Sequence, residues 1–171
     1  MKCLMPLNQR QAIAESINGK RYVEWGSGGT TLWLSEHANP SRAVTIEHDA
    51  QWLRLVLQHM RDESWDFSPQ TGIVPGQNAT PAEEVALHPA GYIDAGVSVD
   101  ADVYLVDGVV RGDCLKALVK TGRPMTVFIH DTQRDWYDDA IAEAVAAGFE
   151  RTDYPEGEDY PGCLLTKLER T

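Results

Sequence analysis

Acidic side chains follow the apolar segments of this sequence at the points where strands are expected to end. Glu24, Glu47 and Asp107 each close one apolar run, and the pair His130-Asp131 closes another. The carboxyl ends of parallel strands meet at one edge of a sheet, where ligands bind in open α/β folds. Carboxylates gathered there repel one another unless they bind a cation, a set of hydroxyls or a shared proton. These strand ends therefore predict a binding and catalytic site.

Asp107, His130 and Asp131 are the candidates for catalysis. His130 titrates near neutral pH and suits a base that removes a proton from a hydroxyl, while Asp131 orients it or binds substrate. Asp107 is an alternative acceptor of that proton. The same three side chains suit a divalent ion, which would lower the pKa of a bound hydroxyl. A structural alternative makes His130 an ordinary hydrogen-bonded residue. Arg111 either forms a salt bridge at a helix start or binds a substrate carboxylate.

A glycine-rich turn, W-G-S-G-G-T at residues 25–30, separates Glu24 from a helix that is expected to begin at Thr31. Glycines let backbone N–H groups approach a ligand closely, and the start of a helix favours an anion. Glu47 follows about twenty residues later, a distance that suits an acid binding a ribose diol. The alternative is a glycine-rich turn without a ligand.

Glu24, the acid before the turn, indicates which kind of nucleotide or adenosyl ligand the site would bind. A dinucleotide fingerprint has a third glycine where this chain has Thr31, and Glu24 would repel a pyrophosphate. An adenosine ligand with a positively charged amino-acid tail fits better, and S-adenosylmethionine is such a ligand. The N–H groups of the turn would hold its carboxylate, and Glu24 would face its ammonium directly or through water. An NAD-dependent oxidoreductase is the less favoured alternative.

Three segments, residues 23–33, 45–49 and 103–108, resemble class I S-adenosylmethionine-dependent methyltransferases. The nearer likeness is to small bacterial methyltransferase-like proteins with the patterns E-W-G-S-G-x-S/T-T, I-E-H-D, D-G-x-x-R and H-D. Plant glucuronoxylan O-methyltransferases carry a related pattern. The resemblance runs from about residue 20 to the end and is specific for the cofactor. The cofactor contacts that we predict are Glu24, Trp25, Gly26, Ser27, Gly28, Thr30, Thr31, Glu47 and His48.

The resemblance also implies a reaction. Because the acids at the strand ends and His130 suit deprotonation of a hydroxyl, we expect O-methylation of a small-molecule or sugar hydroxyl. The N-P-P-Y turn that marks many amine methyltransferases is absent, and D-G-V-V stands at residues 107–110 instead. The alternative is a non-catalytic protein that binds adenosyl ligands. Some small O-methyltransferases of this fold hold a metal ion, and Asp107 and Asp131 match two of its ligands. A third ligand, commonly Asn, is Thr132 here, so no residue is assigned to a metal and a divalent ion stays an option.

The hydrophobic pattern predicts the elements that position these residues. Helices are expected over 7–17, 31–38, 50–61, 112–121 and 136–147, and strands over 21–24, 43–47, 102–107, 125–129, 149–154 and 163–168. Residues 62–100 are least legible, with a short strand over 71–74 and a helix-like segment from Tyr92. The alternation predicts a doubly wound, Rossmann-like α/β fold in three αβα layers. Its sheet is mostly parallel and ends in an antiparallel hairpin.

The length and composition limit the classes of protein to which the chain can belong. The 171 residues are enough for a single domain over 1–171, and a net charge of −11 argues against a nucleic-acid partner. The sequence contains no run of about 20 apolar residues, so no membrane span is expected. The first residues do not have the pattern of a signal peptide, so we expect a cytoplasmic protein. Cys3, Cys114 and Cys163 are scattered, without the spacing of a zinc site or a disulfide framework. The oligomeric state stays open.

Overall fold

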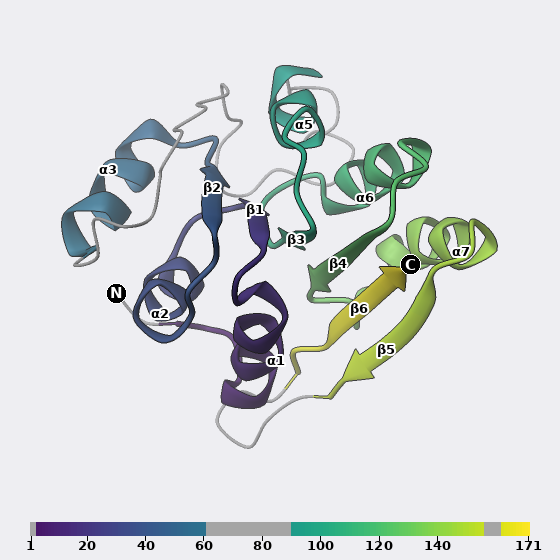
Figure 1. The fold of residues 1–171 in the computed structure, drawn as a ribbon, viewed down its shortest axis with the longest axis horizontal. Helices are drawn as coiled ribbons and strands as arrows, with labels where there is room; N and C mark the ends of the chain where they lie inside the picture. The colour runs from purple at the N-terminus through teal and green to yellow at the C-terminus, as the bar shows by residue number, and fades with distance from the viewer. Residues whose placement is uncertain (1–2, 61–89, 156–161) are drawn as a thin grey trace.

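The computed structural model describes residues 3–60, 90–155 and 162–171 (Figure 1). The helices are α1 (Leu7–Ile17), α2 (Gly29–His37), α3 (Ala50–His59), α5 (Ala90–Val97), α6 (Arg111–Lys120) and α7 (Asp138–Ala146), with a 3-10 turn, η1 (Asp135–Tyr137), before the last. The strands are β1 (Arg21–Trp25), β2 (Arg42–Ile46), β3 (Val103–Val106), β4 (Met125–His130), β5 (Glu150–Tyr154) and β6 (Leu165–Arg170). Within these residues, no helix is both long enough and apolar enough to cross a bilayer.

The strands form one mixed sheet in the order β2-β1-β3-β4-β6-β5. The pairs β1–β2, β1–β3 and β3–β4 are parallel, whereas β6 runs antiparallel to both β4 and β5. The predicted Rossmann-like sheet with a closing antiparallel hairpin is therefore confirmed. The chain moves outward from β1 to β2 and then returns to place β3 on the other side of β1. This reversal creates a switch point at the carboxyl ends of β1 and β3, where α/β folds bind their ligands.

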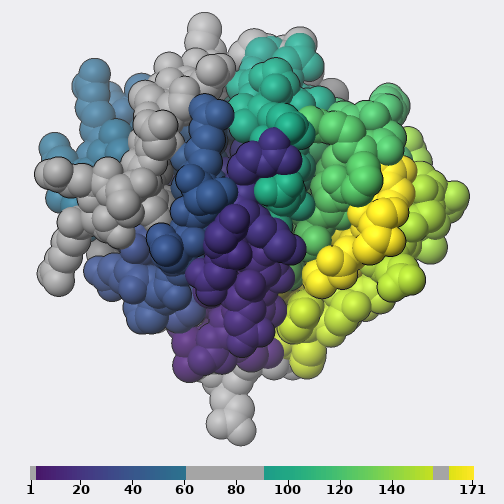
Figure 2. All heavy atoms as spheres, viewed as in Figure 1, coloured from purple at the N-terminus to yellow at the C-terminus, as the bar shows by residue number. Residues whose placement is uncertain are grey.

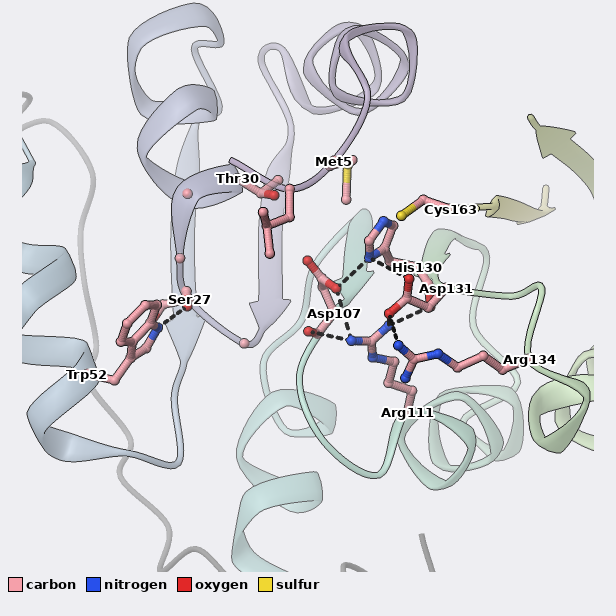
Figure 3. A pocket seen from close by; sticks show the side chains of 14 residues that line it. Met5, Ser27, Thr30, Trp52, Asp107, Arg111, His130, Asp131, Arg134 and Cys163 are labelled. Carbon is pink, nitrogen blue, oxygen red and sulfur yellow. Dashed lines mark hydrogen bonds and ion pairs between the residues drawn. The ribbon is translucent and has the colours of Figure 1, made fainter. Parts of the chain in front are cut away.

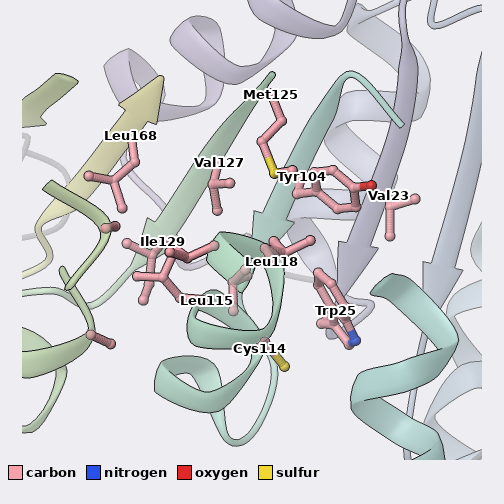
Figure 4. Packing of buried hydrophobic residues seen from close by; sticks show 14 of the residues in the cluster. Val23, Trp25, Tyr104, Cys114, Leu115, Leu118, Met125, Val127, Ile129 and Leu168 are labelled. Atoms are coloured by element: carbon pink, nitrogen blue, oxygen red, sulfur yellow. The ribbon is translucent and has the colours of Figure 1, made fainter. Parts of the chain in front are cut away.

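Helices cover both faces of the sheet because successive strand residues point to opposite sides. On one face Trp25 and Val127 pack with Leu115 and other side chains of α5, α6 and α7 (Figure 4). On the other face Tyr22 and Phe128 belong to a second cluster with residues of α1 and α2. Figure 2 shows α1 lying across this second face, beside the C-terminal strand β6. The layers are thus helix, sheet and helix, as predicted.

The N-terminal helix is joined to the C-terminal hairpin by one buried polar side chain. Gln9 Nε2 donates to the carbonyl oxygens of Tyr154, Pro155 and Cys163 at 3.1, 3.2 and 3.0 Å. A buried amide with several acceptors fixes the position of the backbone that it bonds. Segments from the two ends of the chain therefore meet beside the sheet, and the backbone at Tyr154, Pro155 and Cys163 is held in place.

Most element boundaries lie within two residues of the predictions. The strand expected over 163–168 is shifted by two residues and spans Leu165–Arg170, because its pairing with β4 continues to the partners Met125 and Arg170. Likewise, the helix expected over 136–147 begins as the turn η1 and continues as α7. The helix-like segment expected from Tyr92 is α5. The short strand expected over 71–74 lies outside the described residues.

Two glycines allow the turn after β1 to touch the loop after β3. Gly26 has φ of +92°, and a Cβ there would lie 2.5 Å from Gly108 Cα. A Cβ on Gly108 would in turn lie 2.3 Å from the hydroxyl oxygen of Tyr92. Side chains at these positions would separate the two loops, so the glycines set the shape of the switch point.

Candidate functional site

A cavity of about 450 Å³ opens at the carboxyl ends of β1, β3 and β4 (Figure 3). One wall is the glycine turn with Gly26, Ser27, Gly28, Gly29, Thr30 and, from α3, Trp52. The opposite wall consists of Asp107, Arg111, His130, Asp131, Arg134 and Cys163. Leu4 and Met5, which precede α1, complete the lining. Its volume lies within the range of roughly 300–1,000 Å³ that is usual for small-molecule sites.

The glycine wall is built around the first turn of α2. The backbone N–H of Gly28 donates to Thr31 Oγ1 at 2.8 Å, which fixes the loop against the helix that it opens. Trp52 Nε1 donates to the carbonyl oxygen of Ser27 at 2.7 Å and places an indole ring over the loop. The remaining N–H groups of a first helical turn have no intrahelical acceptor and favour an anion. This wall therefore suits a ligand carboxylate.

Glu24 lies in the interior behind this wall and does not line the cavity. Its carboxyl accepts hydrogen bonds from Tyr22 Oη at 3.0 Å and from Thr31 Oγ1 at 2.7 Å. Burial raises its pKa from 4.5 to about 7, although these hydrogen bonds act in the opposite direction. The carboxyl thus carries only part of a negative charge at neutral pH, and its predicted contact with an ammonium group stays a prediction.

Glu47 holds the glycine turn from the end of β2. Its Oε2 accepts from Ser27 N at 2.9 Å and from Ser27 Oγ at 3.1 Å, and its Oε1 accepts from Asp49 N at 2.9 Å. Burial alone would raise the pKa of Glu47, but the bonds from His48, Asp49 and Ser27 lower it below its usual value. Asp49 caps α3, because its side chain accepts hydrogen bonds from the backbone N–H groups of Gln51 and Trp52.

On the opposite wall, Asp107 and His130 form a hydrogen-bonded pair. His130 Nδ1 lies 2.9 Å from Asp107 Oδ1 and 3.8 Å from Asp131 Oδ1. Burial opposes protonation of the imidazole, yet the charge and hydrogen bond of Asp107 raise the pKa of His130 above its usual value. The second ring nitrogen, Nε2, is buried and has no hydrogen-bond partner among the described residues. A buried polar atom without a partner in a cavity wall is typical of a group that meets a ligand.

Arg111 ties the ends of β3 and β4 together. Its guanidinium donates to the carbonyl oxygens of Gly108 and His130 at 2.8 and 2.7 Å, and to Asp131 Oδ2 at 2.9 Å. It also reaches Asp107. The salt bridge expected for Arg111 is present, whereas binding of a substrate carboxylate stays a prediction. Arg134 is half-exposed and pairs with the same Asp131 oxygen at 3.0 Å.

The structure brings most of the predicted residues to one cavity. Those that line it are Gly26, Ser27, Gly28, Thr30, Asp107, Arg111, His130 and Asp131. Glu24, Thr31, Glu47 and His48 are not among the residues that line it. Trp25 points away from the cavity into the core, where its Nε1 donates to Tyr92 O at 3.0 Å and its ring stacks on Tyr104. Its indole therefore does not cover this cavity.

Several lining residues are not among the predicted site residues, and four of them come from outside the glycine turn and the strand ends: Leu4, Met5, Trp52 and Cys163. Trp52 had a usable signal, since it stands in the first turn of a helix whose cap, Asp49, is evident from the sequence. The other three had none. Their positions depend on how the segment before α1 and the loop before β6 pack beside the sheet.

No model of a known protein family matches the chain, and no curated protein sequence matches it. Solved structures match it over nearly its whole length. A methyltransferase-like protein from Silicibacter pomeroyi is 20% identical, with 99% of this chain and 89% of that chain covered and a TM-score of 0.66. A TehB-like SAM-dependent methyltransferase from Corynebacterium glutamicum is 14% identical, with 95% and 87% covered and a TM-score of 0.56.

A third match is the precorrin-6y C5,15-methyltransferase from Geobacter metallireducens, which is 11% identical with 100% of this chain and 92% of that chain covered and a TM-score of 0.61. The chain has the class I methyltransferase fold. In a methyltransferase fold of this strand order, the cavity lies at the expected switch point of the sheet. One fold carries many chemistries, so the methyl acceptor has to be argued from the site itself.

Proposed function

We propose that this protein is an S-adenosylmethionine-dependent methyltransferase that transfers a methyl group to a hydroxyl oxygen of a small molecule or sugar. The observation that carries the proposal is the division of one cavity into two unlike walls. One wall presents the start of α2 and its glycine turn, and the other presents Asp107, His130 and Asp131. A cofactor held by the first wall would direct its sulfonium methyl toward a group activated by the second.

The wall that contains the glycine turn, called the cofactor wall from here on, supports an adenosyl ligand with an amino-acid tail. The start of α2 offers N–H groups to the tail carboxylate, and Glu47 lies behind Ser27 at the end of β2, where a ribose diol would bind. The buried Glu24 lies behind the same turn. An ammonium group placed near it would favour its ionised form, since an opposite charge lowers a carboxyl pKa.

The opposite wall, with Asp107, His130 and Asp131, is called the acceptor wall from here on, and it supports an oxygen nucleophile. A neutral hydroxyl must lose its proton as methyl transfer proceeds, and the Asp107–His130 pair can hold that proton. Two routes are open to this wall: direct proton removal by His130, or a divalent ion that lowers the pKa of the hydroxyl. In both routes the remaining work is to align the hydroxyl with the sulfonium methyl and to exclude water.

Several finer expectations belong to this proposal. The chain is taken as a single domain over 1–171 that works in the cytoplasm. The net charge of −11 supports a small or carbohydrate acceptor rather than a nucleic acid. A non-catalytic protein that binds adenosyl ligands is the rival reading, and the experiments below separate the two.

Calorimetry with S-adenosylmethionine, S-adenosylhomocysteine and NAD tests the cofactor. We expect both adenosyl ligands to bind and NAD not to bind. Glu47→Gln should weaken adenosyl binding by about 10-fold or more, because hydrogen bonds to charged groups are worth about 1.5–3 kcal/mol. Glu15→Gln, the same change on the exposed side of α1, is the matched control. Binding of NAD alone would refute the methyltransferase proposal.

Formation of S-adenosylhomocysteine from a panel of hydroxylated sugars and phenols tests the acceptor wall. With a productive acceptor, Asp107→Asn and His130→Gln should each reduce kcat by about 100-fold or more, since a positioned acid or base contributes roughly 10²–10⁴-fold. Their affinities for S-adenosylhomocysteine should stay near the wild-type value. Full activity in both variants would remove this wall from the chemistry, and cofactor binding without turnover on any acceptor would favour the non-catalytic reading.

A further inference from the structure

We propose that the acceptor wall contains a site for a zinc-like divalent ion with His130, Asp131 and Cys163 as its ligands. One ligand atom from each of these residues lies within 4.8 Å of the others. An imidazole nitrogen, a carboxylate oxygen and a thiolate sulfur form the ligand set of a borderline ion such as Zn²⁺. This set differs from the one that the sequence suggested, because Cys163 takes the place of Asp107.

His130 is oriented as metal-binding histidines are. Its Nδ1 is occupied by Asp107 Oδ1 at 2.9 Å, which leaves the buried Nε2 as the ring nitrogen without a partner among the described residues. Metal-ligating histidines almost always donate their other ring N–H to a carboxylate or carbonyl oxygen, which fixes the tautomer and the ring. Asp107 therefore positions the ligand and is not itself one.

Asp131 keeps one oxygen for an ion. Arg111 and Arg134 both bind its Oδ2, at 2.9 and 3.0 Å. Its Oδ1 receives a long contact of 3.4 Å from Gln133 Nε2 and lies 3.8 Å from His130 Nδ1. Since both arginines are bound to Oδ2, the second oxygen is the one that can coordinate a cation.

Cys163 is held against these two residues by the backbone around it. Gln9 Nε2 donates to its carbonyl oxygen at 3.0 Å, and the following residue, Leu164, donates its N–H to Gln133 Oε1 at 3.0 Å. Leu164 O in turn accepts from Thr132 N at 3.0 Å. Figure 3 shows the sulfur of Cys163 and the ring of His130 turned toward each other.

The distances require only small side-chain movements. Bonds of about 2.0–2.3 Å in a tetrahedral site put neighbouring ligand atoms roughly 3.3–3.8 Å apart. Ligand atoms that lie up to 4.8 Å apart therefore have to approach one another by about 1–1.5 Å when an ion binds. Binding would release the thiol proton to solvent, because the thiolate is the ligand.

Three protein ligands leave a fourth position open to the cavity. Zinc sites with an open position bind water or substrate there and lower the pKa of that molecule. An acceptor hydroxyl in this position would be activated toward the methyl group, and this role rests on the proposed function. Ion binding itself does not depend on it.

Cobalt(II) added to the full-length, chelator-treated protein tests the site without any cofactor. We expect a single ion to bind, with a cobalt–thiolate charge-transfer band in the near ultraviolet that is removed when Zn²⁺ displaces the cobalt. Cys163→Ser should abolish this band, whereas Cys3→Ser, at the other part-exposed thiol, should keep it. Asp107→Asn should weaken the affinity by about 10- to 100-fold, the usual effect of removing a carboxylate that orients a metal-binding histidine.

Absence of the charge-transfer band in the wild-type protein would overturn the proposal, as would its persistence in Cys163→Ser. Calorimetry with S-adenosylmethionine on the same metal-free protein separates the two proposals. Cofactor binding without ion binding refutes the metal site alone, and ion binding without cofactor binding refutes the methyltransferase function alone.

Discussion

Replacing Glu24 with glutamine should make the protein more stable at alkaline pH relative to the wild type. Glu24 is fully buried, and it accepts hydrogen bonds from the neutral hydroxyls of Tyr22 and Thr31. Burial raises its pKa from 4.5 to about 7. Each pKa unit corresponds to about 1.4 kcal/mol, so ionisation of this carboxyl costs the folded state roughly 3 kcal/mol.

The sign follows from which state holds the proton. Below about pH 4.5 the carboxyl is protonated in both the folded and the unfolded state, so Glu24 does not lower the free energy of unfolding there. As the pH rises, the unfolded chain releases the proton first, so stability falls until the pH has passed about 7. Glutamine is neutral throughout and shows no such loss.

The measurement is the free energy of urea unfolding, followed by tryptophan fluorescence, for the wild type and Glu24→Gln. Between about pH 5.5 and about pH 8.5 the difference should shift by about 2 kcal/mol in favour of the variant. Glu15→Gln, on the exposed side of α1, controls for the chemical change. A difference between the wild type and Glu24→Gln that does not vary with pH would refute the reasoning, because Glu24 would then titrate alike in both states.

Two further predictions concern the supports of the site, and both are checked by urea unfolding. Gly26→Ala should lower the free energy of unfolding more than Gly148→Ala does. Both glycines have φ of +92°. A Cβ at position 26 would lie 2.5 Å from the backbone of Gly108, whereas a Cβ at position 148 would have nothing within 4 Å. We expect about 1–2 kcal/mol for the backbone conformation alone and additional loss at Gly26. Equal losses would show that the loop contact is not tight. Arg111→Met should lower the free energy of unfolding by about 3 kcal/mol, because it removes a buried guanidinium from Asp107, Asp131 and three backbone carbonyl oxygens. Arg134→Met should lower it by under about 1 kcal/mol, since that side chain is 45% exposed and Arg111 only 12%. A larger loss for Arg134→Met would contradict this.

The part of the site that the sequence predicted is the part encoded locally. The turn at Gly26 and Gly28, the acid at the end of each strand and the cap at Asp49 are each evident within a few residues. Parallel pairing then brings strand ends together without further information, which is why Asp107 and His130 lie in contact as expected.

The part that the sequence did not predict depends on contacts between distant segments. Nothing near Cys163 indicates a ligand, and its place beside His130 follows from the buried Gln9 and from the loop at Gln133. Trp25 was predicted to contact the cofactor, but its indole packs in the core against Gly96. A Cβ at position 96 would lie 2.0 Å from the indole, so only glycine leaves room for it.

The sequence by itself determined the sheet, the glycine turn and the carboxylates at its edge, because periodicity and turn chemistry act over short distances. Only the tertiary structure decided which of these carboxylates face the cavity and which are buried. Burial removes water from Glu24 and places it behind the turn, whereas Asp107 and Asp131 stay at the cavity wall, held by Arg111 and His130. Desolvation depends on the whole packed chain, so no local pattern could reveal it.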